Sequence, residues 1–298
     1  MYVKLTEVGP RDGFQSVKEF IPTEIKIKII EGIISSGVKK IQLGSFVSPK
    51  AIPQMQDAKE IFEYFLGKYK DTDIEFFALV PNFKGAANAY DVGVREISYV
   101  ISVSESHNKA NVNKTHDESF AELEKIMQSY KELKVCLDVA TAFGCPFEGE
   151  MSISSLMSFL ERGYELGIRN FNICDTIGVA YPTQVRKTVK TILESFKDCS
   201  FDIHIHDTRN MGIVNTLTAI QEGISNIQTA LGGLGGCPFA PGASGNTSSE
   251  DMVYMLEKMN VSTGISFEQL LNIAKYQKEV VKGNFSGHHI NIEKPCNS

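Results

Sequence analysis

Residues 23–43 read TEIKIKIIEGIISSGVKKIQL, and this stretch contains the unit from which the fold is built. Its first part has the composition of a helix that starts at Pro22-Thr23 and stops at Gly37. The apolar run Lys40–Leu43 follows within three residues and is typical of a buried strand. The stretch therefore predicts a helix followed by a strand, with a glycine as the boundary between them.

The same unit recurs along the chain. Helix-compatible segments also precede Gly93, Gly167 and Gly223, and each of these glycines is followed within a few residues by another strand-like run. The eight apolar runs are Val3–Leu5, Lys40–Leu43, Ile74–Val80, Glu96–Val103, Lys134–Val139, Asn170–Cys174, Phe201–His204 and Asn226–Ala230. Eight strands that alternate with helices, without a linker between two halves, predict one (β/α)8 TIM barrel of the α/β class.

The eightfold pattern ends near Ser262. We therefore expect a (β/α)8 barrel catalytic domain over residues 1–262 and a short C-terminal helical extension over residues 263–298, packed on the barrel. Within this extension, Phe267–Val281 predicts a helix and Lys282–Ser298 a polar tail. The length of 298 residues is one that α/β barrels commonly reach as a single domain.

The composition excludes several classes of function. The formal net charge is −6, and no basic stripe is present that could follow a phosphate backbone, so we expect no nucleic-acid partner. No run approaches the ~20 apolar residues of a membrane span, and the first residues lack the apolar core of a signal peptide. We therefore expect no membrane partner and a cytoplasmic location. The six cysteines form no C-x-x-C pair, which argues against a zinc knuckle or a disulfide scaffold.

Two histidines, His204 and His206, stand at the end of the apolar run that begins at Phe201. Residues i and i+2 of a strand point to the same side, so both imidazoles could bind one metal ion. Two histidines in a strand can equally be core or surface groups without a ligand. The pair alone leaves both interpretations open.

The barrel hypothesis brings further reactive residues to the same place, because functional groups of such barrels come from the C-terminal ends of different strands. The candidates that follow strand ends are Arg11, Asp12, Gln42, Asp175, His204, His206, Cys237 and Asn246. Two of them have simpler interpretations. Asp12 could stabilise the turn at Gly13, and Asn246 could simply occupy the turn formed by residues 244–246.

Seven motifs occur in order over nearly the whole chain. They are residues 7–13 (EVGPRDG), 45–50 (SFVSPK), 53–55 (PQM), 144–149 (GCPFEG), 175–179 (DTIGV), 204–208 (HIHDT) and 232–246 (GGLGGCPFAPGASGN). With these motifs the chain resembles the hydroxymethylglutaryl-CoA lyases, within the larger group of metal-dependent barrel lyases and Claisen-type synthases related to isopropylmalate synthase. The resemblance implies a TIM barrel and an oxo-acid lyase activity.

The resemblance also implies a divalent metal site. Its ligands would be Asp12, His204, His206 and Asn246, and the ion would be Mg²⁺ or Mn²⁺. By ligand type alone, two oxygens and two imidazole nitrogens suit Mn²⁺, Zn²⁺ or Fe²⁺, so Zn²⁺ remains an alternative.

Catalytic roles follow from the same resemblance. Arg11 would stabilise the enolate oxygen that develops when a carbon–carbon bond breaks, and Cys237, on a glycine-rich loop, would take part in proton transfer. An unreactive thiol in a turn is the alternative for Cys237. Asp175 is either a general base or relay, or a cap for the turn at Thr176–Gly178. His204 would serve catalysis as a metal ligand.

Gln42 departs from the family pattern, which has Glu at this position to orient the arginine. A Gln side chain can still accept from Arg11 through its amide oxygen, but a neutral acceptor forms a weaker bond than a carboxylate. We therefore expect Gln42 to favour a more anionic substrate or to lower activity.

Two further segments depart from the pattern. Arg209–Met211 stands where the family continues Tyr-Gly-Gln, and the basic segment that contacts coenzyme A is not recognisable in residues 280–289. Within the latter, Lys282 could meet a phosphate or remain a solvated surface residue. His288 and His289 are adjacent and make a poor metal pair.

Three functions remain open at this point. The leading hypothesis is a metal-dependent lyase that cleaves 3-hydroxy-3-methylglutaryl-CoA to acetyl-CoA and acetoacetate. The second is a related lyase or Claisen-type synthase that acts on a different hydroxy or keto acid or acyl-CoA. The third is a catalytically weakened metal-binding barrel. In each case we expect a small-molecule acyl-CoA or hydroxy-acid partner and a homo-oligomer, a dimer.

Overall fold

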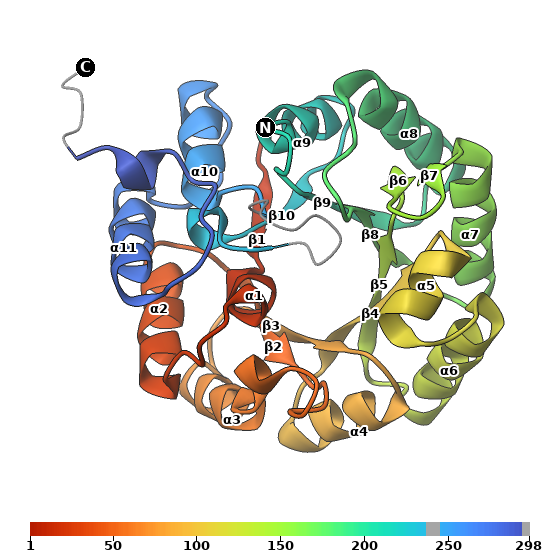
Figure 1. Ribbon diagram of the computed structural model, residues 1–298, viewed down its shortest axis with the longest axis horizontal. Helices are drawn as coiled ribbons and strands as arrows, with labels where there is room; N and C mark the ends of the chain where they lie inside the picture. Colours follow the sequence, from red (N-terminus) through yellow and green to blue (C-terminus); the bar gives the residue numbers. More distant parts are fainter. Residues whose placement is uncertain (237–244, 294–298) are drawn as a thin grey trace.

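In the computed structural model, which describes residues 1–236 and 245–293, eight parallel strands close into a barrel (Figure 1). Around the barrel the strands follow the order β1-β10-β9-β8-β5-β4-β3-β2. Their bounds are β1 (Lys4–Glu7), β2 (Lys40–Ser45), β3 (Glu75–Val80), β4 (Glu96–Ser102), β5 (Lys134–Ala140), β8 (Asn170–Asp175), β9 (Ser200–Ile205) and β10 (Asn226–Thr229). A small antiparallel hairpin pairs β6 (Gly144–Cys145) with β7 (Gly149–Glu150). The predicted barrel is confirmed.

Helices surround the barrel and connect its strands. They are α1 (Phe14–Ser16), α2 (Thr23–Ser35), α3 (Ala58–Lys68), α4 (Phe83–Val92), α5 (Glu105–Val112), α6 (His116–Ser129), α7 (Ile153–Glu165), α8 (Pro182–Ser195), α9 (Gly212–Gln221), α10 (Ser249–Lys258) and α11 (Phe267–Val280). The helices predicted before Gly93, Gly167 and Gly223 are α4, α7 and α9. Gly37 follows α2 at a φ of 107°, and a Cβ there would lie 2.6 Å from the Gly264 carbonyl oxygen, so both backbone shape and space require glycine.

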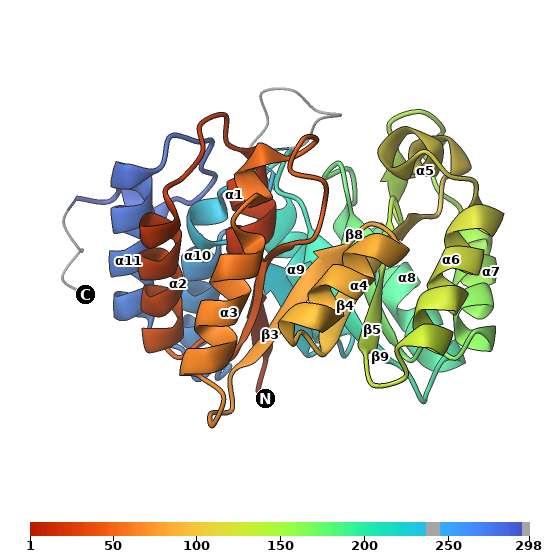
Figure 2. The same ribbon diagram turned by 90° about the horizontal axis from the view of Figure 1, so that it is seen from below.

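The last helix, α11, lies between α10 and α2 in the outer ring (Figures 1 and 2). The sequence predicted it over Phe267–Val281, one residue longer than observed. A Cβ on Gly32 of α2 would lie only 2.5 Å from Ile273 Cγ1, so the missing side chain allows the two helices to approach closely. The division of the chain into domains at residue 262 stays a prediction.

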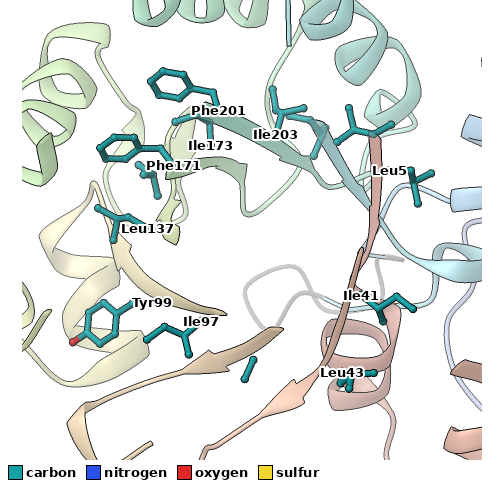
Figure 3. Packing of buried hydrophobic residues seen from close by; sticks show 14 of the residues in the cluster. Leu5, Ile41, Leu43, Ile97, Tyr99, Leu137, Phe171, Ile173, Phe201 and Ile203 are labelled. Atoms are coloured by element: carbon teal, nitrogen blue, oxygen red, sulfur yellow. The ribbon is translucent and has the colours of Figure 1, made fainter. Parts of the chain in front are cut away.

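The two faces of the barrel strands differ in polarity. The outward side chains, among them Ile97, Leu137 and Phe171, form an apolar core between the strands and the helices (Figure 3). The interior of such barrels is usually filled by branched apolar side chains. Here the N-terminal end of the interior instead holds a cavity of about 240 Å³. Its lining includes the charged residues Lys4, Lys40, Glu75, Glu96, Lys134 and Asp202.

A buried ion pair connects α2 to the segment before α3. Lys26 Nζ lies 2.7 Å from Asp57 Oδ1 and donates to the Gln54 carbonyl oxygen at 2.6 Å. Thr23 Oγ1 donates to the other oxygen of Asp57 at 2.9 Å. The side chains of Lys26 and Asp57 are 1% and 6% exposed. Neither charge can be removed without leaving the other in an apolar environment.

We therefore expect Lys26→Ala to lower the free energy of unfolding by about 3–5 kcal/mol, the usual cost of breaking a buried pair from one side. Urea unfolding measures the change. The control is Lys59→Ala, which removes an exposed lysine 3.7 Å from Glu63 and should cost less than about 1 kcal/mol. Equal losses for both variants would contradict this account of Lys26.

Candidate active site

Three strand ends bring the predicted metal ligands together. After β1, a tight turn over Gly9–Gly13 carries Asp12, whose backbone N–H donates to the Val8 carbonyl oxygen at 2.7 Å. His204 lies within β9, and His206 directly follows it. Asn246 pairs with His206 in an isolated antiparallel bridge. The turn after β1 leads directly into α1, so the C-terminal ends of the strands form the end of the barrel that carries α1, opposite the N-terminus (Figure 2).

The side chains of Asp12, His204 and His206 point toward one another. The two Nε2 atoms are 3.1 Å apart, and each lies 3.9 Å from Asp12 Oδ2. Each of the three residues offers one ligand atom, and these three atoms all lie within 4.8 Å of one another. Two imidazole nitrogens and a carboxylate oxygen at such distances make a possible divalent metal site.

The charges in this cluster favour a cation. Burial by itself raises the pKa of Asp12, but Arg11, both histidines and a hydrogen bond from Asn246 lower it below its usual value. Burial lowers the pKa of His204 and of His206, and the charge of Asp12 opposes this only in part. The carboxylate is therefore ionised and the imidazoles are neutral, which is the protonation state that metal binding requires.

Asn246 completes the donor set that the sequence predicted. Its side chain is fully buried, and its Nδ2 donates to the Leu234 carbonyl oxygen at 2.9 Å. Its Oδ1 has no hydrogen-bond partner among the described residues. A buried oxygen of this kind costs free energy unless something binds it, and a hard cation would do so. The residues present therefore fit a divalent ion.

Arg11 lies beside this cluster. Its Nε donates to Gln42 Oε1 at 2.5 Å, and its Nη1 forms an ion pair with Asp12. The hydrogen bond expected between Gln42 and Arg11 is thus present in the structure. The guanidinium keeps further N–H groups for a ligand, because Gln42 and Asp12 occupy only two of its five donors.

Asp175 makes the contacts of a turn cap. Its two carboxylate oxygens accept from the backbone N–H groups of Val179 and Ala180 at 2.9 and 3.0 Å. Burial raises the pKa of Asp175 to about 6, although these bonds oppose the change. Its capping interpretation therefore has direct structural support, and a role in proton transfer stays a prediction.

The glycine-rich segment that leads to Cys237 is held by two buried glutamate side chains that no sequence motif had indicated as functional. Glu7 Oε1 accepts from the backbone N–H groups of Gly9 and Leu231, both at 2.8 Å, and Glu250 Oε2 accepts from Gly232 at 2.8 Å. Cys237 itself lies outside the described residues. Glu7 is the first residue of the first motif, but its contact with Leu231 is visible only once β1 and β10 pair to close the barrel.

Two departures from the family pattern have structural explanations. Arg209 Nη1 donates to the carbonyl oxygens of Ile177 and Gly178, both at 2.9 Å, and so joins the loops that follow β8 and β9. Lys282 forms an exposed ion pair with Glu19 at 3.2 Å, and both interpretations of this lysine stay predictions.

The adjacent histidines of the C-terminal segment also have a protein partner. The backbone N–H groups of His288 and His289 donate to Asp251 at 2.7 and 3.0 Å, and His289 Nδ1 lies 2.5 Å from Asp251 Oδ1. These contacts tie the segment to α10, and the expectation that the two rings make a poor metal pair stays a prediction.

Comparison with known proteins decides the family. The HMGL-like family model matches residues 2–276. The chain belongs to the HMGL-like family. A hydroxymethylglutaryl-CoA lyase of Bacillus subtilis is 39% identical over 279 residues, which cover 93% of this chain and 92% of the relative. The mitochondrial hydroxymethylglutaryl-CoA lyase of Rattus norvegicus is 37% identical, with 92% and 84% of the two chains covered.

Solved structures of this family have the same fold. An HMG-CoA lyase from Acinetobacter baumannii, in complex with coenzyme A and 3-methylmalate, has a TM-score of 0.92 and 37% identity over 100% of this chain and 97% of the other. The Bacillus subtilis HMG-CoA lyase has a TM-score of 0.91 and 37% identity, with 97% of each chain covered. The family assignment made from the motifs is therefore confirmed.

The metal-site geometry predicts that Asp12→Asn weakens Mn²⁺ binding by more than about tenfold, because even residues outside the ligand shell commonly contribute that much. Titration of the protein with Mn²⁺, followed by electron paramagnetic resonance of the free ion, measures the affinity. Asp202→Asn is the control, since this carboxylate lies on the same strand as His204 but lines the cavity at the far end. The same affinity in Asp12→Asn as in the unmodified chain would argue against the site.

Glu250 predicts a pH-dependent stability. Burial raises its pKa to about 8, so the folded chain holds a proton that the unfolded chain releases above its ordinary pKa of 4.5. The stabilising effect of this proton is complete below pH 4.5 and is lost as the pH rises toward 8, by at most about 1.4 kcal/mol per pH unit. Glu250→Gln lacks this loss, so its melting temperature relative to the unmodified chain should be higher at pH 8 than at pH 5.

Glu257→Gln on the same helix is the control, because Glu257 is exposed. A constant difference in melting temperature between Glu250→Gln and the unmodified chain from pH 5 to pH 8 would show that Glu250 does not bind the proton.

Proposed function

We propose that this member of the HMGL-like family cleaves 3-hydroxy-3-methylglutaryl-CoA to acetyl-CoA and acetoacetate, with Mg²⁺ or Mn²⁺ as its cofactor. The observation that carries the proposal is the convergence of Asp12, His204 and His206 beside Arg11 at one barrel mouth. Relatives also support the proposal, because proteins that are 36–39% identical over most of the chain are named hydroxymethylglutaryl-CoA lyases.

Two groups of residues at this barrel mouth would carry out the reaction, the metal ligands and Arg11. Asp12, His204, His206 and Asn246 would hold the divalent ion, and Lewis-acid assistance to loss of the 3-hydroxyl proton is the chemistry that such an ion supplies. Once that proton leaves, the C2–C3 bond breaks, a ketone forms at C3, and the bonding electron pair moves into the thioester as an enolate. A proton returned to C2 completes acetyl-CoA.

Arg11 would meet the enolate oxygen. Its guanidinium is always charged, and Gln42 and Asp12 hold it in one orientation at the barrel mouth. A preorganised donor of this kind lowers the barrier because it is placed where negative charge develops. Cys237 would supply or accept a proton, as the resemblance implies.

A related substrate is the second candidate, and two observations favour it. A neutral amide rather than a carboxylate binds Arg11 Nε, and Lys282 is paired with Glu19. Both features belong to parts of the site that would contact the acyl group or the coenzyme. A different hydroxy or keto acid or acyl-CoA is therefore the alternative substrate class.

The cellular location and the assembly of the chain are further proposals. None of the helices within the described residues is long and apolar enough to cross a membrane. A cytoplasmic location and a homodimer both stay predictions.

The purified chain with Mn²⁺ or Mg²⁺ should release acetoacetate and acetyl-CoA in equal amounts from 3-hydroxy-3-methylglutaryl-CoA. A chelator should abolish the release, as should His204→Ala. Arg11→Lys keeps the charge but loses the planar fork of donors, and kcat should fall by about 10²–10³-fold, the usual effect of one oxyanion donor.

The outcome with other substrates separates the functions. Turnover of a free hydroxy acid but not of its CoA thioester would support the second candidate. Mn²⁺ binding without turnover of any hydroxy acid or acyl-CoA would reject both.

A further inference from the structure

The segment that follows α11 packs against Asn246, one of the proposed metal ligands. Ser286 Oγ donates to the backbone carbonyl oxygen of Asn246 at 2.7 Å, and Gly287 N–H donates to the Gly232 carbonyl oxygen at 3.0 Å. Residues 283–289, the C-terminal strap, lie beyond residue 276, where the match to the family model ends. Membership of the family therefore does not by itself give the strap a role.

The strap and the glycine-rich segment 231–236 approach each other so closely that no side chain fits between them. A Cβ on Gly233 would lie 1.8 Å from Ser286 Oγ, which also lies 3.4 Å from the Gly233 carbonyl oxygen. On the side of the strap, a Cβ on Gly287 would lie 2.5 Å from Glu250 Oε1. The two segments are therefore in direct backbone contact.

The strap controls both ends of Asn246. Its backbone oxygen accepts from Ser286, and its side-chain Nδ2 donates to the Leu234 carbonyl oxygen at 2.9 Å. A carbonyl oxygen only accepts, so the NH₂ group of the amide must face Leu234 and its Oδ1 must face away. The next residue, Gly235, donates its N–H to the Asn284 carbonyl oxygen of the strap at 3.3 Å. The strap thus holds the backbone of Asn246 and also the segment that orients its side chain.

Asp251 anchors the other end of the strap to α10. Its two carboxylate oxygens accept from the backbone N–H groups of His288 and His289 at 2.7 and 3.0 Å, and His289 Nδ1 lies 2.5 Å from one of them. The carboxylate is only 4% exposed. Hydrogen bonds from successive backbone N–H groups to one ionised carboxylate are strong and fix the path of the chain.

We propose that Ser286 and Asp251 are positioning residues for the metal ligand Asn246, Ser286 by direct contact and Asp251 through the strap. The inference rests on the proposed function in one respect, that a divalent ion binds Asn246 Oδ1. This oxygen is buried and has no hydrogen-bond partner among the described residues, so only the contacts at the backbone and at Nδ2 orient it. A ligand that is oriented before the ion arrives loses less conformational entropy on binding.

The first test observes Asn246 in the metal-free chain. After labelling with ¹⁵N-asparagine, the side-chain NH₂ resonances of Asn246 are identified by their absence in Asn246→Asp. Ser286→Ala should shift them, because loss of the bond at the backbone oxygen allows the side chain to turn. Ser36→Ala is the control, since this buried serine at the end of α2 donates to the Ile33 carbonyl oxygen, also at 2.7 Å. Resonances that keep their positions in Ser286→Ala would overturn the proposal.

The second test measures Mn²⁺ affinity by electron paramagnetic resonance of the free ion. Ser286→Ala, Asp251→Asn and Gly287→Ala should each weaken binding by about tenfold, the lower end of the effect of residues that orient a ligand. Gly287→Ala removes no hydrogen-bonding group and only pushes the strap away from Glu250. Its control is Gly67→Ala, where a Cβ meets nothing within 4 Å. Unchanged affinity in Ser286→Ala or in Asp251→Asn would contradict the proposed role.

A double-mutant cycle separates positioning from a general loss of structure. In an Asn246→Ala background the ligand oxygen is absent, so Ser286→Ala should lower Mn²⁺ affinity no further. A disturbance of the whole barrel mouth would instead lower the affinity by the same factor in both backgrounds. That result would overturn the proposal.

These measurements are independent of the lyase assignment. An Mn²⁺ affinity that depends on Ser286 only when Asn246 is present supports the positioning role, even in a chain that cleaves no thioester and so rejects the proposed function. Cleavage of 3-hydroxy-3-methylglutaryl-CoA together with unchanged Mn²⁺ affinity in Ser286→Ala supports the proposed function and overturns the positioning role.

Discussion

The pairing of β1 with β10 is the constraint on which the site depends, because it joins the two ends of the barrel sheet. Its register runs from Lys4 opposite Asn226 to Glu7 opposite Thr229. The residues directly after β1 thereby come next to the segment that follows β10, and Asp12 reaches Asn246 across more than two hundred residues of chain. Glu7 spans the same seam, since it binds Gly9 on one side and Leu231 and Ser249 on the other.

Much of this arrangement could be predicted from the sequence, because the alternation of helices, glycines and apolar runs is a local signal. The spacing of His204 and His206 is local too. The strand that carries them runs parallel to its neighbours, as the barrel prediction requires. The motifs then supplied Asp12 and Asn246, which no spacing rule connects. The hairpin formed by β6 and β7 was not predicted, since strands of two residues carry almost no pattern.

The roles of Glu7, Glu250 and Asp138 could not be predicted from local patterns. Glu7 and Asp138 stand in or beside apolar strands and Glu250 stands in a polar stretch at the start of a helix, and the partners of all three are distant in sequence. Only the closed barrel shows that Glu7 and Glu250 bind backbone N–H groups, whereas Asp138 binds side chains. In each case a buried acidic side chain supplies a hydrogen-bond acceptor to polar groups that would otherwise be left unpaired.

Arg209 has a consequence for motion at the barrel mouth. Its guanidinium binds two successive carbonyl oxygens of the loop after β8, although it belongs to the loop after β9. Gly178 lies so close to the second loop that a Cβ there would be 2.8 Å from Thr208. The two loops are therefore joined by a side chain and by close packing, so a ligand that displaced one of them would have to displace the other or break these contacts.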